Sequence, residues 1–317
     1  MKKRILAVLI ATALAVSVTG CAGNATSSSD STSASSVAES SDTSTQTSSD
    51  ASSEDESKEE SSQEESKDLE ANYTKYTLDG DLTQHMIDMS RLNEGNKVRL
   101  ANVIKKLKNG EEVTVGFIGG SITQGTSAGN DLCYAKLTAD WLQKTYSNAK
   151  INYVNAGIGA TGSYIGVHRV ENDLLSKKPD LVFVEFSVND TTENTERNKK
   201  SYDGLLRTIW KSSTNPAIIT IATTQEDGTS FQDQHAEIVK HYDLPMISYR
   251  NTILDTIKHG DIVWKDISDD NIHPNVPGHK IVSQLLQAYI SDVDKDVDNI
   301  SGSESDFTTP ATDAPIE

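Results

Sequence analysis

Short apolar runs rich in β-branched residues alternate with amphipathic segments about five times along the middle of this chain. The runs show little polar–apolar alternation, which is typical of strands buried on both faces of a parallel sheet. The amphipathic segments carry apolar residues at helical spacing and are long enough to cross back over such a sheet. The pattern predicts an α/β fold, a doubly wound parallel sheet in a three-layer α/β/α sandwich of the flavodoxin-like type. The expected strands are residues 113–118, 151–155, 181–187, 216–222 and 245–249, and the expected helices are residues 82–90, 93–107, 131–146, 163–175, 199–211, 231–241, 253–258 and 277–293.

The first 21 residues have the composition of an export signal. Three basic residues precede an apolar run over residues 5–16, and small residues then lead to Cys21. The run is too short to span a bilayer comfortably. The segment resembles a bacterial lipoprotein signal, in which cleavage leaves Cys21 as a lipidated N-terminus. The alternative is an ordinary secretory signal with an incidental cysteine. We expect a protein anchored by lipid to the bacterial cell membrane and facing the exterior.

Two acidic segments flank the part of the chain that can fold. Residues 22–70 contain mainly Ser, Thr, Asp and Glu, and they predict a disordered linker that acts as a tether. Residues 295–317 predict a disordered acidic tail. Most of the net charge of −18 lies toward the two ends of the chain, so the part at residues 71–291 of the predicted domain (residues 71–294) is nearly neutral. This distribution argues against nucleic acid as a partner. We expect no disulfide, because the only other cysteine is Cys133 and a lipidated Cys21 could not pair with it. Cys133 is expected to be a small core residue.

The first expected strand ends abruptly at Gly119-Gly120-Ser121. Ligands of open parallel sheets bind outside the carboxyl ends of the strands, so a serine in this turn is a candidate nucleophile. Its own amide is a candidate donor to an oxyanion. Taken alone, the segment also fits a strand-to-helix turn in which the serine caps the helix.

A glycine-rich loop over residues 157–162 follows the second expected strand. Its backbone can approach a ligand closely, and one of its amides could donate to an oxyanion. The spacing also fits the G-x-G-x-x-G pattern of dinucleotide-binding proteins. That pattern belongs after the first strand, with an acidic residue ending the next strand, and the loop meets neither condition. Dinucleotide binding is therefore the weaker interpretation.

Two further polar segments follow strands near the end of the chain. Asn189 lies where the third strand ends, and its neutral amide could donate to a developing negative charge, although a plain Asx turn would look the same. Asp190 could fix this loop through backbone amides. Asp270 and His273 are three residues apart, so the carboxylate could hold one imidazole nitrogen while the other faces a serine.

Together these four segments resemble the SGNH (GDSL-like) hydrolase family, whose name lists its Ser, Gly, Asn and His residues. They occur in the family's order between about residues 113 and 286. Ser121 matches the nucleophile block, with Gly120 in place of the usual Asp. Asn189 matches the Gly-x-Asn-Asp block, with Ser187 in place of Gly. The closing Asp-x-x-His block matches Asp270 and His273.

The resemblance implies a serine esterase that forms an acyl-serine intermediate and requires no metal or cofactor. Ser121 would be the nucleophile and His273 the general base, with Asp270 holding the imidazole. The amides of Ser121 and Gly159 and the side chain of Asn189 would hold the oxyanion. The family often places its oxyanion glycine where this chain has Ala160, so that amide is an alternative to Gly159.

The substrate expected for such an exported esterase is an acetylated or otherwise short-chain acylated polysaccharide. Four aromatic residues could line a sugar cleft or pack in the core: Tyr134, Tyr164, Trp210 and Trp264. A lysophospholipase, an acyltransferase and a non-catalytic glycan-binding protein on the same fold remain alternatives.

Overall fold

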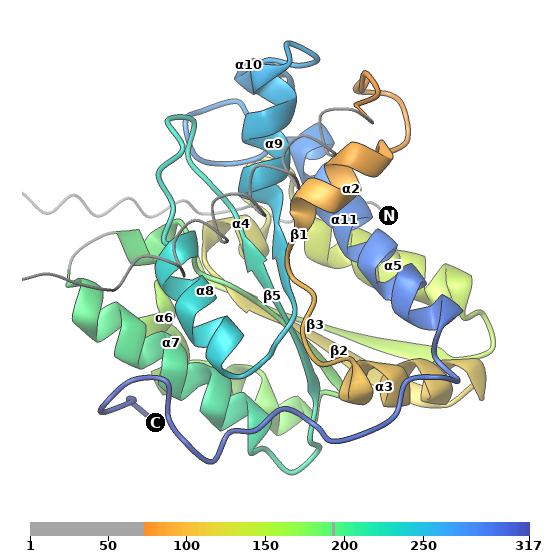
Figure 1. Ribbon diagram of the computed structural model, residues 1–317, viewed down its shortest axis with the longest axis vertical. Coiled ribbons are helices and arrows are strands. Elements are labelled where there is room, and N and C mark those ends of the chain that lie inside the picture. The colour runs from red at the N-terminus through yellow and green to blue at the C-terminus, as the bar shows by residue number, and fades with distance from the viewer. Residues whose placement is uncertain (1–72, 192–193) are drawn as a thin grey trace, which may run out of the picture. The chain divides into compact units, whose positions relative to one another are not determined.

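The computed structural model, drawn in Figure 1, describes residues 73–191 and 194–317. The predicted signal peptide with Cys21 and the predicted linker over residues 22–70 lie outside the described residues, and both stay predictions. Within the described part of the chain, no helix combines the length and the apolar character that a membrane crossing needs.

One six-stranded sheet forms the centre of the fold, with the strand order β1-β6-β5-β4-β2-β3. Strands β2 to β6 run parallel in the flavodoxin-like order, so the predicted α/β fold class is confirmed. The edge strand β1 pairs antiparallel with β6. It was not predicted, because three residues are too few to carry a periodic signal. The strands are β1 Arg91–Asn93, β2 Glu112–Gly119, β3 Lys150–Gly157, β4 Leu181–Glu185, β5 Ala217–Ala222 and β6 Met246–Ser248.

Helices cover both faces of this sheet (Figure 1). Residues of α2, α3, α5, α9 and α11 share one hydrophobic core with the sheet, and residues of α6, α7 and α8 share the other. The long helices are α2 Gln84–Ser90, α3 Val98–Lys108, α5 Tyr134–Thr145, α6 Ser163–Asp173, α7 Thr195–Trp210, α8 Gln232–His241, α9 Tyr249–Lys258 and α11 Val276–Lys295. The short ones are α4 Ser121–Gln124, η1 Leu175–Lys177, η2 Asn189–Thr191 and α10 Trp264–Ile267.

Strand β4 shows why the apolar runs lack alternation. Phe183 stacks on Phe117 of β2 with ring centroids 4.6 Å apart and belongs to the core under α5 and α11. Its neighbours Val182 and Val184 belong to the opposite core, under α6 and α7. All five residues of β4 are buried, so each face of the strand needs apolar side chains.

The chain after α11 is ordered, and the prediction of a disordered tail over residues 295–317 is wrong. Phe307 stacks on both Trp210 and Tyr242, with centroid distances of 4.5 and 3.9 Å. The amide and hydroxyl of Thr312 both donate to Asp203 of α7, each over 2.7 Å. The composition suggested disorder because the tail is acidic, but Phe307 packs against Trp210 at the end of α7 and against Tyr242 just after α8.

We expect Phe307→Ala to lower the free energy of unfolding by about 3 kcal/mol, the usual cost of deleting a buried phenylalanine side chain. Phe307 is 6% exposed, and its loss removes the shared contact between Trp210 and Tyr242. Urea unfolding measures the change. Phe307→Leu should restore a large part of the stability, and an unchanged midpoint in Phe307→Ala would mean that the tail does not pack in solution.

Candidate active site

The ends of β2, β3 and β4 bring three candidate loops to one edge of the sheet. Gly119, the last residue of β2, pairs with Gly157 of β3 and with Glu185 of β4. Parallel strands in register end together, so the segments that follow them start side by side. Ser121 follows β2, the glycine-rich loop follows β3, and Asn189 follows β4.

Ser121, His273 and Asp270 form a continuous hydrogen-bonded chain. The Nε2 atom of His273 lies 3.0 Å from the Ser121 hydroxyl oxygen, and its Nδ1 atom lies 2.7 Å from Asp270 Oδ2. A carboxylate can only accept, so Nδ1 carries the ring proton and Nε2 presents a lone pair to the serine hydroxyl. The structure thus brings together three residues that are separated by up to 152 positions in the sequence.

Backbone amides stabilise the ionised form of Asp270. Partial burial alone would raise its pKa, but hydrogen bonds from the backbone and ring of His273 and from the backbone of Ile272 outweigh burial and lower the pKa below its ordinary value. The two amides donate to Oδ1 over 2.6 and 2.7 Å, which leaves Oδ2 for the imidazole. The carboxylate therefore stays charged where it orients the histidine.

Hydrogen bonds from buried side chains hold the loop that carries Asp270 and His273. The hydroxyl of Ser268, which is fully buried, lies 2.8 Å from the carbonyl oxygen of Asp270 and 2.6 Å from that of His273, so its single proton can go to either. The indole of Trp264 also donates to the Asp270 carbonyl, over 2.6 Å. The loop then leads into α11, where the Asn275 side chain caps the helix by accepting from the amide of Gly278. These contacts fix the loop that presents His273.

Asn189 lies against the turn before the nucleophile. A Cβ atom added at Gly120 would come within 1.9 Å of the Asn189 side-chain oxygen, so the amide group lies directly over the Gly120 backbone. This position next to Ser121 matches the oxyanion role predicted from the sequence, which stays a prediction. The close approach also explains why position 120 is a glycine, because any side chain there would displace Asn189.

The amide of Gly159 has a partner that the sequence did not suggest. It donates to the side-chain oxygen of Gln124 over 2.9 Å. Gln124 ends the short helix α4 that begins at Ser121. The oxygen of Gln124 thus takes the place that an oxyanion would need, and Gly159 can serve as a donor only after this side chain moves. The alternative donor, Ala160, has a left-handed backbone with φ of 58°.

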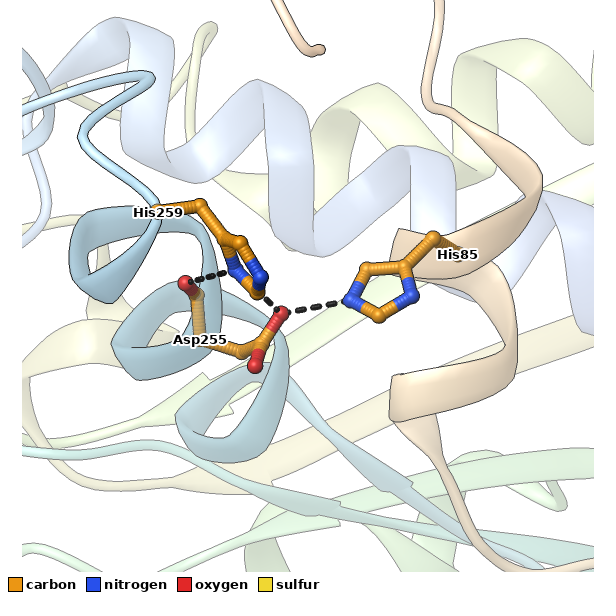
Figure 2. Close-up of side chains that lie close together, drawn as sticks. All are labelled: His85, Asp255 and His259. Carbon is orange, nitrogen blue, oxygen red and sulfur yellow. Dashed lines mark hydrogen bonds and ion pairs between the residues drawn. The ribbon is translucent and has the colours of Figure 1, made fainter. Parts of the chain in front are cut away.

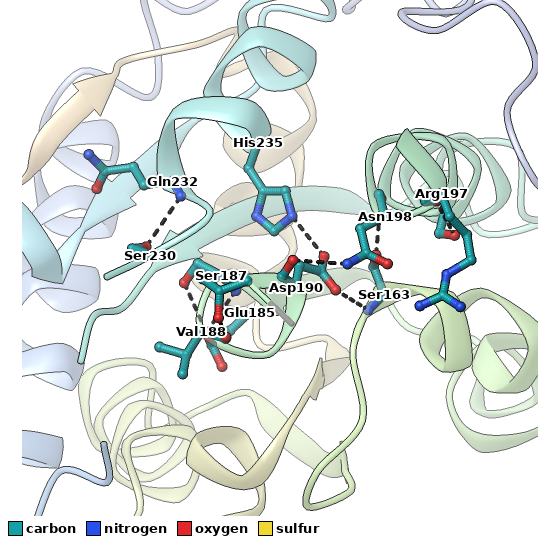
Figure 3. Close-up of polar contacts among 12 residues, drawn as sticks. Ser163, Glu185, Ser187, Val188, Asp190, Arg197, Asn198, Ser230, Gln232 and His235 are labelled. Atoms are coloured by element: carbon teal, nitrogen blue, oxygen red, sulfur yellow. Dashed lines mark hydrogen bonds and ion pairs between the residues drawn. The ribbon is translucent and has the colours of Figure 1, made fainter. Parts of the chain in front are cut away.

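Asp190 fixes the start of α6 and not its own loop (Figure 3). One of its carboxylate oxygens accepts from the amide of Ser163 over 2.8 Å, and the other lies 2.9 Å from Nε2 of His235. Both Asp190 and His235 are almost completely buried, and Tyr202 stacks on the His235 ring at 3.6 Å. Because Asn189 is next to Asp190, this contact sets the glycine-rich loop relative to Asn189.

Glu185 is a buried acid and the last residue of β4, four residues before Asn189 in the sequence. It accepts hydrogen bonds from the amide and hydroxyl of Ser187 and from the hydroxyl of Thr223, as part of the network that Figure 3 shows. Burial raises the pKa of Glu185 to about 7, and these hydrogen bonds offset only part of the increase. Ser187, which replaces the usual glycine, thus serves as a partner for this acid.

We expect Glu185 to make the protein less stable as the pH rises from about 4.5 to about 7. Its pKa is higher in the folded chain, so the folded state binds more protons over this interval and loses stability as they leave. The shift corresponds to about 3 kcal/mol. The free energy of unfolding, measured with urea at pH 5 and at pH 8, should differ less between the two pH values for Glu185→Gln than for the parent chain. Glu171→Gln, at an exposed position, should keep the pH difference of the parent chain. If Glu185→Gln also keeps that difference, the raised pKa of Glu185 is not its source.

A polar hollow of about 440 Å³ lies beside Gln124, between α4 and the end of β3. Its lining consists of Gln124, Asn130, Tyr153, Asn155 and Gly157. The aromatic residues suggested from the sequence for a sugar cleft do not line it. Tyr134 and Trp264 are buried in the core, and Trp210 packs against the tail.

The sequence analysis missed three residues that shape the site: Gln124, Glu185 and His235. Two signals were available. Glu185 is an acid at the end of an otherwise apolar run, and Gln124 lies three residues after Ser121, one turn along the same short helix. His235 gave no local signal, because its partner is 45 residues away.

Residues 117–281 match the model of the GDSL-like lipase/acylhydrolase family, a span of more than half of the chain. The chain belongs to this family. The match includes all four segments that gave the resemblance, from Ser121 to His273.

Solved structures share the fold of this chain. The chain shares 38% sequence identity with a two-domain esterase active on acetylated mannans, with a TM-score of 0.68 over 71% of this chain and 61% of that protein. The same esterase has also been crystallised with mannopentaose. The enzyme LAE5, from a metagenome of Lake Arreo in Spain, shares the fold at 18% identity and a TM-score of 0.50, over 56% of this chain and 95% of that one. No curated protein matches the chain. This GDSL-like chain spans about 61% of the length of the mannan esterase.

Proposed function

We propose that this protein is a carbohydrate acetyl esterase that acts through an acyl-serine intermediate. The single observation that carries the proposal is the hydrogen-bonded chain from Ser121 through His273 to Asp270 at the carboxyl edge of the sheet. Family membership supports it, and so does the similarity to an esterase active on acetylated mannans.

In the proposed first step, the Ser121 oxygen attacks the ester carbonyl while Nε2 of His273 takes the hydroxyl proton. The charged Asp270 stabilises the imidazolium that forms. The carbonyl oxygen becomes an oxyanion, and the Ser121 amide, at the start of α4 and outside that helix's own hydrogen bonds, donates to it together with Asn189. The imidazolium then protonates the leaving alcohol, and the acyl-serine remains. Water releases the acid by the same route in reverse.

The polar hollow beside Gln124 favours a hydroxyl-rich alcohol. Its volume of about 440 Å³ is lined by amide and phenol groups and not by an apolar wall. Such groups bind sugar hydroxyls, and a long acyl chain would gain little there. We therefore propose that the hollow takes sugar units and that the acyl group is short, as in an acetylated polysaccharide.

We further propose that the protein is a lipoprotein attached to the cell membrane through Cys21, facing the exterior. The support is the order of basic residues, apolar run and Gly20-Cys21 at the N-terminus. Labelling with a radioactive fatty acid tests this, with Cys21→Ser as the control that should remove the label. Labelling that persists in Cys21→Ser would exclude this anchor.

Acetate release from a panel of acetylated glycans tests the enzymatic function. Acetylated mannan, acetylated xylan, a lysophospholipid and a long-chain ester should be compared, with Ser121→Ala as the blank. Release from a glycan that disappears in Ser121→Ala supports the proposal. Release only from the lipid substrates would indicate a lysophospholipase, and acyl transfer to an added sugar at the expense of free acetate would indicate a transferase. Binding of glycans without any Ser121-dependent turnover would indicate a non-catalytic protein.

A further inference from the structure

Two histidines and an aspartate converge between α2 and α9. They belong to other segments of the sequence than the loops that carry Ser121, Asn189 and His273. Figure 2 shows the rings of His85 and His259 turned toward the same carboxylate, that of Asp255. Asp255 lies on α9 and His259 caps its C-terminus four residues later, so both point to one side of the helix. His85 comes from α2, which is 170 residues earlier in the chain.

The three side chains offer donor atoms at near-chelating distances. Asp255 Oδ2 lies 2.6 Å from Nε2 of His85 and 3.2 Å from Nδ1 of His259, and all three ligand atoms lie within 4.8 Å of one another. A tetrahedral zinc ion separates its ligand atoms by roughly 3.3 Å. One of the contacts with Asp255 already fits this spacing. The contact of Asp255 with His85 must open by less than 1 Å to reach the same spacing.

The charge of the cluster also suits a cation. Asp255 pairs with two histidines, and within the part of the chain that the structure describes, no lysine or arginine forms an ion pair with it. The Tyr73 ring stacks on His259 with the ring centroids 4.2 Å apart and covers one face of that imidazole. A divalent cation would neutralise the charge of Asp255.

We propose that His85, Asp255 and His259 form a zinc-binding site that clips α2 to α9. Two imidazole nitrogens and one carboxylate oxygen are a donor set that zinc commonly takes from proteins, with a water molecule as the fourth ligand. The side chains of His85, Asp255 and His259 are 4%, 15% and 22% exposed, so the cluster is largely enclosed yet open to solvent on the side of His259.

Metal binding requires a change in both rings. Nδ1 of His259 lies 2.9 Å from the backbone carbonyl oxygen of Asp255, which can only accept, so this nitrogen carries a proton when no metal is bound. Nε2 of His85 is a donor to Asp255 for the same reason. Zinc would therefore shift the proton of each ring to its other nitrogen. Without metal, the same contacts act as a simple hydrogen-bonded staple.

Zinc titration of the full chain tests the site, after removal of any affinity tag and treatment with a chelator. Calorimetry should show one saturable zinc ion per chain, and the melting temperature should rise with zinc. Asp255→Asn and His259→Gln keep the size and polarity of the side chains but should lose both effects. His168→Gln, at an exposed histidine of α6, should behave like the parent chain.

Nitrogen NMR of the histidine rings gives a readout that stability alone does not. Zinc should move the protons of His85 and His259 to the opposite ring nitrogens and leave His168 unchanged. Absence of saturable binding would overturn the proposal, as would binding that survives in both Asp255→Asn and His259→Gln. These outcomes are independent of the esterase proposal, because none of the readouts uses turnover.

Discussion

Ser121→Ala should lower kcat for an acetyl ester by about 10⁴- to 10⁶-fold, the usual cost of removing the nucleophile of such a triad. The hydroxyl lies 3.0 Å from Nε2 of His273, so the parent chain has its nucleophile already in contact with its base. The alanine variant keeps the oxyanion donors and the substrate hollow. We expect KM to change little, and the fall in kcat measured under saturating p-nitrophenyl acetate to report the chemical step.

The double variant provides the decisive comparison. His273→Ala should cost about as much as Ser121→Ala, and the two changes together should cost no more than either one, because both residues serve one proton transfer. Circular dichroism and the melting temperature should remain close to those of the parent chain, since the Ser121 and His273 side chains are partly exposed. Multiplying losses in the double variant would mean that the two residues act in separate steps, and the proposed mechanism would fail.

The fold could be predicted because it follows from patterns that each segment carries by itself. The run before Gly119 shows little alternation, and in the structure its residues are buried in cores on both faces of β2. The order of strands follows from short right-handed connections between parallel strands. The edge strand β1 carries no such pattern, because it has only three residues, although it pairs with β6.

The outline of the site was predictable for a related reason, whereas its supporting contacts were not. Residues at the ends of adjacent parallel strands must lie together, which places Ser121 near Asn189. The partners of the supporting side chains come from distant segments: Gln124 reaches Gly159 across 35 positions, and Asp190 reaches His235 across 45. No local pattern in the sequence specifies such pairs.

The ordered tail illustrates the limit of composition as a guide. Acidic residues in the last segment suggested that it could not offset its ordering entropy. The structure gives these acids basic partners on α7: Glu317 contacts Arg207 and Lys211, and Asp313 lies 2.8 Å from Lys200. Acidic residues that repel one another within the tail are attracted to basic residues on α7. The composition of a segment therefore predicts disorder only when no other part of the chain offers it such partners.

Gly120→Ala should reduce kcat by about 10²- to 10³-fold, comparable to the loss of one oxyanion donor. A Cβ atom at this position would come within 1.9 Å of the Asn189 side-chain oxygen, and Asn189 is the group that has to move. The φ of Gly120 is −88°, outside the left-handed region that favours glycine, so the displaced Asn189 side chain is the main expected effect of the change. Steady-state kinetics should show a fall in kcat, with little change in the melting temperature.

Asn189→Ala provides the matched control, because it removes the same donor without touching the turn. If Gly120→Ala acts only by displacing Asn189, the double variant should be no slower than Asn189→Ala alone. The family's usual residue gives a second check. Gly120→Asp adds the same Cβ atom and should be impaired at least as much as Gly120→Ala in this chain. Full activity in Gly120→Asp would mean that Asn189 can keep its position beside a side chain, and that the close approach to Gly120 does not decide where the donor lies.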